Sequence, residues 1–319
     1  MRSELFVVDA ANRATAFPFE GNAIGPIRGG FQWLHLDGRD QASQRWVRMG
    51  SELPPTVSAA LLAFETRPRA APVGDGVLIN LRGLGETPDD DPDALVSIRL
   101  WAERGRVISL DMNRLAALLP VREAMLAGKM RDPGDLVAAI AVGITDGLDP
   151  DVAAMGDAID ECETALDRRG ARPQRSRISQ IRSRAIGYRR FVAPQRDAML
   201  RLAGFEVDWF DEADRLHLRE AADRFARMTE ELEAMRERAG LIHEQILEMR
   251  SEQLDQRSFL ISVVALIFLP LTFLTGVFGM NVALPLQDDP NAFVRLMALC
   301  ALIAGGFVAL FLLLRWVRR

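Results

Sequence analysis

The sequence has few of the residues that build disulfide scaffolds and transition-metal sites. Its 319 residues include two cysteines, Cys162 and Cys300, and three histidines, His35, His217 and His243. Two cysteines exclude a disulfide-stapled scaffold, and there is no CxxC or HExxH motif. His217 and His243 are too far apart on one predicted helix to chelate a single ion. His35 lies in a strand-like run, where we expect a buried, hydrogen-bonded core residue.

Signatures of catalysis are missing as well. There is no Gly-x-Ser-x-Gly motif, and Gly83-Leu-Gly85 lacks the third glycine of a dinucleotide-binding loop. The acidic run Pro88–Asp93 could touch a cation, but it lacks the spacing of a calcium loop and is better interpreted as a polar turn. We therefore expect no catalytic residues and no cofactor, and the sequence leaves any resident metal site unknown.

Charge is present but unevenly distributed. The chain has 39 basic and 44 acidic residues and a net charge of −5, which argues against nucleic-acid binding through overall positive charge. An apolar fraction of 49% argues against disorder. Between Phe259 and Leu314 only Asp288, Asp289 and Arg295 are charged. A charged soluble body is thus joined to an apolar C-terminal end.

Two uncharged segments in this end are long enough to cross a membrane. Phe259–Phe278 and Leu296–Leu314 match the roughly 20 residues, or about 30 Å of helix, that span the hydrocarbon core of a bilayer. We predict transmembrane helices at 259–278 and 293–314, joined by an external loop at 279–292.

Basic residues near the two segments predict the topology. Arg250 and Arg257 precede the first segment, and a basic tail at 315–319 follows the second. The connecting loop has no lysine or arginine, so both termini should be cytoplasmic, as in a multi-pass protein of a bacterial-type inner membrane. The first residues, MRSELFVVDA, contain no signal-peptide apolar region.

Residues 211–258 are predicted to form a long stalk helix. Asp211–Gln256 contains no proline and one glycine, Gly240, and apolar residues recur at alternating spacings of three and four. This pattern predicts a packed helix with a coiled-coil seam that continues without a break into the first span. The seam residues are Leu218, Ala221, Phe225, Met228, Leu232, Met235, Ala239, Ile242, Ile246 and Met249.

A second stripe on the same helix is small, hydroxylated or acidic. In the membrane segment it contains Ser258, Ser262, Ala265, Leu269, Thr272, Gly276 and Gly279, and toward the body it contains Asp255, Ser251, Glu248, Glu244, Glu237 and Glu230. One interpretation is close packing of membrane helices, with the glutamates as a solvated face. The other is that several copies surround a pore, with hydroxyls lining the membrane part and carboxylates attracting cations. Two spans cannot enclose a pathway, so a pore requires a homo-oligomer.

The body divides into two predicted regions. Residues 1–112 form an α/β domain with strands at Leu5–Val8, Trp33–Leu36, Val77–Leu81, Val96–Trp101 and Arg106–Leu110, and helices at Gln41–Met49 and Val57–Glu65. Residues 113–210 are helical, with breaks expected near Pro133, Pro150 and Pro173. Within them the basic segment Arg172–Phe191 should pair with the acidic stalk, and binding to anionic lipid or to nucleic acid is the less favoured alternative.

A tripeptide after the first span carries a family resemblance. Gly279-Met280-Asn281 follows a long stalk and a span and precedes a second span. In this context it resembles the CorA family of divalent metal cation transporters. The segments Leu269–Asn281, Tyr188–Ala203 and Trp33–Gly38 look most like its zinc-transporting, ZntB-like branch, and the likeness covers nearly the whole chain.

The resemblance implies a funnel-shaped homopentamer with an α/β cytoplasmic domain, long stalk helices and a central pore lined by the first span. It implies that Gly279 carbonyls and the Asn281 side chain, within Gly279-Met280-Asn281, form the ring that receives hydrated cations, and that Thr272 faces the pore. The stripe adds Leu269, Ser262, Ser258 and Asp255 as pore-lining candidates. Asp288, Asp289, Glu248 and Glu244 are candidates for cation attraction, with a solvated turn or helix face as the alternative.

One departure concerns the external loop. Members of the zinc branch often follow the tripeptide with a glycine-rich loop, whereas this loop reads VALPLQDDP. We hypothesise Zn²⁺ uptake, with the lipid bilayer and divalent cations as partners and no nucleic acid. The resemblance to the zinc branch further implies that uptake is coupled to protons. A Mg²⁺/Co²⁺ channel of the same family is the first alternative. A membrane-anchored coiled-coil sensor or scaffold without conduction is the alternative of another class.

Overall fold

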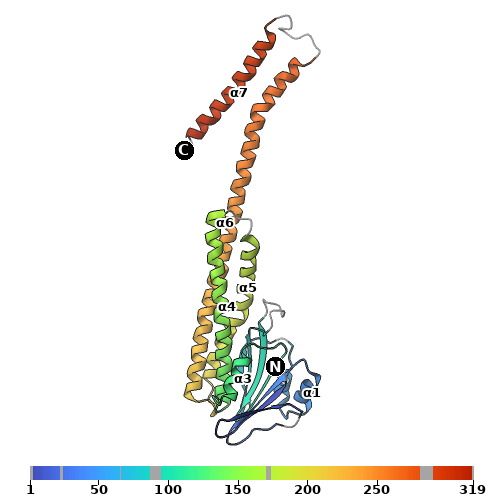
Figure 1. Cartoon of the computed structure of the whole chain (residues 1–319), viewed down its shortest axis with the longest axis vertical. Helices are drawn as coiled ribbons and strands as arrows, with labels where there is room; N and C mark the ends of the chain where they lie inside the picture. Colours follow the sequence, from blue (N-terminus) through green and yellow to red (C-terminus); the bar gives the residue numbers. More distant parts are fainter. Residues whose placement is uncertain are drawn as a thin grey trace. The chain divides into compact units, whose positions relative to one another are not determined.

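A computed structural model describes residues 3–21, 24–64, 66–86, 95–169, 174–280 and 290–317. The chain divides into two compact units, Met1–His243 and Glu244–Arg319. The first unit, called the body below, contains a sheet and the helices packed on it (Figure 1). Helix α6 (Glu212–Phe278) begins in the body and ends in the second unit, which also contains helix α7 (Ala292–Val317).

The body is built on a seven-stranded sheet with the order β2-β1-β3-β7-β6-β5-β4. All five predicted strands are present, as β1 (Glu4–Val8), β3 (Phe31–Asp37), β5 (Gly76–Gly83), β6 (Val96–Glu103) and β7 (Arg106–Asp111). The predicted hairpin between β6 and β7 is confirmed, and its turn holds Gly105 at a φ of 75°. Strands β3 and β7 are parallel, whereas the other neighbouring pairs are antiparallel.

The two edge strands were not predicted from the sequence. They are β2 (Ala14–Pro18), which pairs with β1, and β4 (Arg69–Val73), which pairs with β5. Each has five residues, and each contains a proline that a central strand would exclude. An edge strand is hydrogen-bonded to a neighbouring strand on one side only, and its other side is open. Its sequence therefore lacks the apolar run that marks the inner strands.

Two short helices cover one face of the sheet. Helix α1 (Gln41–Met49) has its predicted bounds, and Asp40 caps it by accepting hydrogen bonds from the backbone N–H groups of Ala42 and Ser43. Helix α2 (Pro55–Leu61) ends before the predicted Glu65. Trp46 and Val57 from these helices join a buried cluster with sheet residues such as Leu34, Leu78, Trp101 and Ile108.

The helical region contains α3 (Leu118–Leu126), α4 (Pro133–Arg169) and α5 (Gln174–Ala203). A helix boundary at Pro133 is confirmed, since proline is favoured in the first turn. The break expected at Pro150 is wrong, because α4 runs through it, as α5 runs through Pro194. A proline removes one backbone hydrogen bond, and packing of a 37-residue helix on its neighbours outweighs that loss.

The seam of α6 is buried as predicted. Nine of its ten residues, from Leu218 to Ile246, are buried, and Met249 is half-buried. Within the body, ion pairs tie α6 to α4, from Arg224 to Asp146 and from Arg238 to Asp160 and Glu163. The predicted seam is therefore covered, within the body, by helices of the same chain.

The basic segment of α5 pairs mostly with α4 instead of the stalk. Arg177 pairs with Glu161, and Arg184 pairs with Asp151, which also accepts a 2.6 Å hydrogen bond from the Tyr188 hydroxyl. Arg189 contacts Glu233 of α6 at 2.6 Å. The predicted pairing with the stalk thus holds for Arg189, while α4 supplies the other two carboxylates.

His35 is a buried core residue, as predicted. Trp33 Nε1 donates to Ser109 Oγ at 2.8 Å, and Ser109 Oγ lies 2.9 Å from His35 Nδ1. Burial lowers the pKa of His35 to about 3, so the ring is neutral at pH 7. His35 Nε2 lies 3.7 Å from Asp111, whose pKa is raised by burial to about 6.

Candidate functional site

The C-terminal half of α6 has the length and composition of a membrane span. A window of 18 residues within Glu212–Val277 has a mean hydropathy of 2.4 and no buried residue. In the described part of α7, the apolar stretch Phe293–Phe307 is shorter. The 67-residue α6 carries both the stalk and the first predicted span without interruption, and it includes Pro270. The predicted continuity of stalk and span is confirmed.

The polar stripe of α6 is exposed along the single chain. Asp255, Ser258, Ser262, Thr272 and Gly279 are all exposed, and Leu269 is 73% exposed within the same stripe. Met280, the second residue of the tripeptide, is 53% exposed. Asn281, Asp288 and Asp289 lie outside the described residues. Among the described residues, no other segment of the chain covers the stripe. Another copy of the chain, lipid or water must therefore contact it.

Two hydroxyl groups of the stripe, those of Ser262 and Thr272, donate to the backbone of the helix itself. Ser262 Oγ donates to the backbone oxygen of Ser258 at 2.9 Å, and Thr272 Oγ1 donates to that of Phe268 at 2.8 Å. A hydroxyl that has donated its proton still has two lone pairs and presents an acceptor outward. Water molecules around a cation point their hydrogens outward, so such an acceptor suits a hydrated cation.

The acidic part of the stripe lies free on the helix surface. Glu230, Glu237, Glu244 and Glu248 are exposed. In the described ranges of the chain none of these four forms an ion pair, in contrast with Glu233, which pairs with Arg189 and Arg236. Unpaired carboxylates on one line of a helix create a negative field along it.

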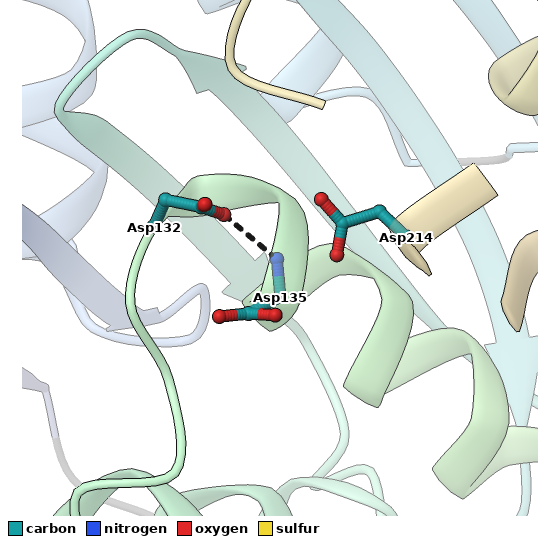
Figure 2. A group of neighbouring side chains, drawn as sticks. All are labelled: Asp132, Asp135 and Asp214. Atoms are coloured by element: carbon teal, nitrogen blue, oxygen red, sulfur yellow. Dashed lines mark hydrogen bonds between the residues drawn. The ribbon is translucent and has the colours of Figure 1, made fainter. Parts of the chain in front are cut away.

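A second acidic group, which sequence analysis did not single out, lies in the body. Asp132, Asp135 and Asp214 each place one carboxylate oxygen within 4.8 Å of the others (Figure 2). Asp132 and Asp135 flank the start of α4, and Asp214 is in the first turn of α6. Asp132 and Asp135 are half-buried, and Asp214 is 1% exposed.

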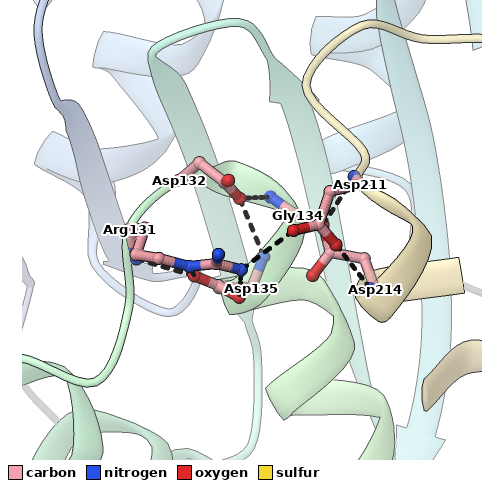
Figure 3. A network of polar contacts seen from close by, with 6 residues as sticks. All are labelled: Arg131, Asp132, Gly134, Asp135, Asp211 and Asp214. Carbon is pink, nitrogen blue, oxygen red and sulfur yellow. Dashed lines mark hydrogen bonds and ion pairs between the residues drawn. The ribbon is translucent and has the colours of Figure 1, made fainter. Parts of the chain in front are cut away.

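Two helix caps bring these carboxylates together (Figure 3). Asp132 accepts hydrogen bonds from the N–H groups of Gly134 and Asp135, at 2.9 and 3.0 Å. Asp211 accepts from the N–H of Asp214 at 2.9 Å, and Asp214 Oδ2 accepts from the N–H of Asp211 at 3.1 Å. These bonds satisfy N–H groups that the first turn of a helix leaves without a partner.

Arg131 is the basic residue of this group. Its guanidinium pairs with both oxygens of Asp135 at 2.9 Å and with Asp211 at 3.0 Å. Burial raises the pKa of Asp132, and it raises the pKa of Asp214 to about 7, with the neighbouring carboxylates acting in the same direction. The backbone N–H of Asp214 lowers the pKa of Asp211.

A sequence signal for this group existed. Both helices start with an aspartate that is followed three residues later by another, as Asp132-x-x-Asp135 and Asp211-x-x-Asp214. The spacing is that of a capping box. It marks each helix start, but it does not indicate that the two starts meet.

Comparison with known proteins decides the family. The family model described as "CorA-like Mg2+ transporter protein" matches residues 28–319. The chain belongs to the CorA family. The resemblance inferred from Gly279-Met280-Asn281 is therefore confirmed, and the CorA family is one of divalent cation transporters in membranes, not of enzymes.

Two relatives of this CorA-family chain carry different names. The zinc transport protein ZntB of Pectobacterium carotovorum is 32% identical over 276 residues, covering 86% of this chain and 84% of the relative. The divalent cation transporter CmaX of Pseudomonas aeruginosa is 33% identical over 293 residues, covering 89% and 87%. The two identities do not separate a zinc transporter from a broader cation transporter.

Solved structures support the CorA fold over the whole chain. The full-length CmaX protein superposes with a TM-score of 0.84 at 30% identity and covers 99% of this chain and 98% of its own. The CorA magnesium transporter of Methanocaldococcus jannaschii has a TM-score of 0.81 at 17% identity and covers 98% and 97%. The predicted fold class, an α/β domain with a long helix continuous with the first span, is confirmed.

Proposed function

We propose that this protein carries divalent cations across a membrane through a pore lined by the polar stripe of α6. The observation that carries the proposal is the exposed line of hydroxyls and small residues on the apolar span of α6, which unpaired carboxylates continue along the charged stalk. One copy cannot enclose a pathway, so the pore requires several copies. The family resemblance supports five, arranged as a homopentamer.

The chemistry of the stripe supports passage of hydrated ions. Ser262 and Thr272 present oxygen acceptors, and the glutamates that continue the stripe have no basic partner among the described residues. In α6 the segment 259–278 contains neither cysteine nor histidine. A dehydrated site of the usual Cys/His kind for Zn²⁺ therefore has no ligands there. Oxygen acceptors that hold the water shell of a cation are the consistent mechanism.

Zn²⁺ uptake, proton-coupled or not, is the finer proposal. A relative named zinc transport protein supports it, as does the likeness of Leu269–Asn281 to the zinc branch. The Mg²⁺ in the description of the family model favours the alternative, a Mg²⁺ channel. Purified protein in liposomes loaded with a zinc-selective or a magnesium-selective dye separates them. Magnesium flux without zinc flux would contradict the zinc proposal.

Thr272→Val tests the stripe. Valine keeps the shape of threonine and removes its oxygen, so we expect cation flux to fall at least several-fold. Thr275→Val is the matched control, because Thr275 also donates to the backbone, to Leu271 O at 3.0 Å, but is not a member of the stripe. Equal flux in both variants and the wild type would contradict a pore along this stripe.

Asn281→Ala tests the proposed outer ring at Gly279-Met280-Asn281. A transporter should lose or alter cation flux, whereas a sensor or scaffold without conduction should leave metal accumulation unchanged. Replacing Asp288 and Asp289 with asparagine tests their proposed role in concentrating cations, which should weaken at high salt.

Assembly and orientation complete the proposal. We expect a pentamer by mass measurement in detergent, and a monomer or dimer would exclude a five-fold pore. We place the protein in a bacterial-type inner membrane with both termini cytoplasmic, on the basis of Arg250, Arg257 and the basic tail 315–319. Cysteines introduced near either terminus or in the loop 279–292, labelled from each side of oriented vesicles, test that orientation. The termini should react from the cytoplasmic side and the loop from the other side.

A further inference from the structure

The strongest chemical feature outside the stripe is the carboxylate group at the starts of α4 and α6, formed by Asp132, Asp135 and Asp214 (Figure 2). It lies entirely within the body and is not part of the proposed pathway. Helix capping explains the backbone bonds of Asp132, Asp211 and Asp214 Oδ2. It does not explain why the other oxygen of Asp214, Oδ1, is buried beside two more carboxylates.

Asp214 is the observation that points to a ligand. The residue is 1% exposed, and its Oδ2 accepts from the backbone of Asp211. Its Oδ1 is buried and has no hydrogen-bond partner in the part of the chain that the structure describes. Figure 2 shows this carboxylate turned toward Asp132 and Asp135. A buried carboxylate oxygen is normally bonded to a donor or to a cation.

The carboxylates around Asp214 outnumber the basic side chains that could neutralise them. Asp132, Asp135, Asp211 and Asp214 surround the group, and Arg131 is the one basic side chain bonded to it among the described residues. The N-termini of α4 and α6 add partial positive charge, but only a fraction of a unit each. Four ionised carboxylates and one guanidinium sum to a charge of −3, which the two helix termini reduce to about −2. A divalent cation would balance that charge.

The spacing fits a cation with oxygen ligands. Metal–oxygen distances of about 2.0 to 2.6 Å place two ligands on opposite sides of an ion about 4 to 5 Å apart. The three oxygens lie within 4.8 Å of one another, so no carboxylate has to move far. All ligands are oxygens, which suits Mg²⁺, Mn²⁺ or Ca²⁺.

We propose that Asp132, Asp135 and Asp214 bind one hard divalent cation within each chain and thereby join the first turns of α4 and α6. Such a site is separate from the transported ion and does not depend on the proposed pore. Cation binding to the folded chain alone would stabilise the body by an amount that grows with the logarithm of the cation concentration above the Kd.

Binding of Mn²⁺ to the full-length protein in detergent tests the proposal, with electron paramagnetic resonance counting bound ions per chain. We expect Asp214→Asn and Asp135→Asn each to bind one Mn²⁺ per chain fewer than the wild type. Both variants keep an oxygen acceptor for the caps. Asp157→Asn is the matched control, because Asp157 is an exposed carboxylate on α4 outside the group. Sites in the pore are common to all four proteins and cancel in the comparison.

Thermal unfolding shows whether each variant is folded and whether Mn²⁺ stabilises it. Mn²⁺ should raise the unfolding temperature of the wild type and of Asp157→Asn, and should do so less in the two cluster variants. The proposal is overturned if either folded cluster variant binds as many Mn²⁺ ions as the wild type. It is also overturned if Asp214→Asn is stabilised at pH 7 with an unchanged Mn²⁺ count, because a proton would then be the occupant of Oδ1.

Discussion

Gly134, in the first turn of α4, lies so close to Asp214, in the first turn of α6, that a Cβ atom on the glycine would overlap Asp214 Oδ2. The same atom would stand 2.8 Å from the backbone oxygen of Trp209. Gly134→Ala should therefore push the two helix starts apart. We expect a loss of about 1 to 3 kcal/mol in the free energy of unfolding of the body.

Gly147→Ala is the control for this prediction. Gly147 lies on an exposed turn of the same helix, and nothing lies within 4 Å of the added methyl group. Alanine has the higher helix propensity, so this variant should be more stable by about 0.5 to 1 kcal/mol. Denaturant unfolding of both variants measures the difference, and equal stability of the two would contradict the close approach of α4 and α6.

The seam of α6 should contribute to the stability of the single chain. Leu232 is fully buried, whereas Leu241 on the same helix is 61% exposed. Leu232→Ala should cost about 2 to 5 kcal/mol, because truncation leaves a cavity, and Leu241→Ala should cost less than about 1 kcal/mol. The loss of stability in Leu232→Ala should not depend on protein concentration, because the same chain covers the seam. A loss that changed with protein concentration would instead show that an interface between chains covers it.

Asp111 should make stability depend on pH. Burial raises its pKa from 3.8 to about 6, so the folded chain holds a proton that the unfolded chain releases. Stability from this group is present below about pH 4 and is lost as the pH rises through about 6, by an amount of about 2 to 3 kcal/mol. Asp111→Asn, which keeps an acceptor for the N–H of Leu115, should remove this dependence and be more stable than the wild type at pH 7.

Unfolding of the wild type and of Asp111→Asn between pH 4 and 7 measures this effect. Asp157→Asn serves as the control, since it removes an exposed carboxylate and should follow the wild-type curve. His35 also contributes in this window, because its pKa falls from 6.5 in the unfolded chain to about 3 in the folded chain, so its contribution to stability rises with pH. That contribution is common to the wild type and Asp111→Asn, so the difference between their curves reports on Asp111. Parallel pH curves for the wild type and Asp111→Asn would show that the buried carboxyl is not the titrating group.

The unpaired glutamates of α6 should act on transport through their field. Glu244→Gln together with Glu248→Gln should lower cation flux by about 2- to 10-fold at low ionic strength, with the difference shrinking as salt is added. Glu231→Gln is the control, because Glu231 is exposed on the same helix but is rotated about 100° from Glu230 of the stripe. A loss that does not change with salt would point to direct coordination instead of attraction.

Sequence patterns were sufficient where the physical cause is local. Heptad spacing and the lack of breakers predicted one helix from the stalk into the span, and α6 runs from Glu212 to Phe278. Apolar runs predicted the five inner strands. The edge strands β2 and β4 were missed because each pairs with one neighbouring strand and is otherwise largely exposed to solvent. Their residues therefore show no periodic apolar pattern.

The sequence by itself determined that α6 has one apolar seam and one polar stripe, because both follow from helical spacing. Only the tertiary structure decided what covers the seam within the body, since a periodic pattern shows that a face is buried but does not name its partner. In the same way, Asp132-x-x-Asp135 and Asp211-x-x-Asp214 each predict a helix start from local bonding. Their meeting around the buried Asp214 depends on the packing of α4 against α6, which no local pattern encodes.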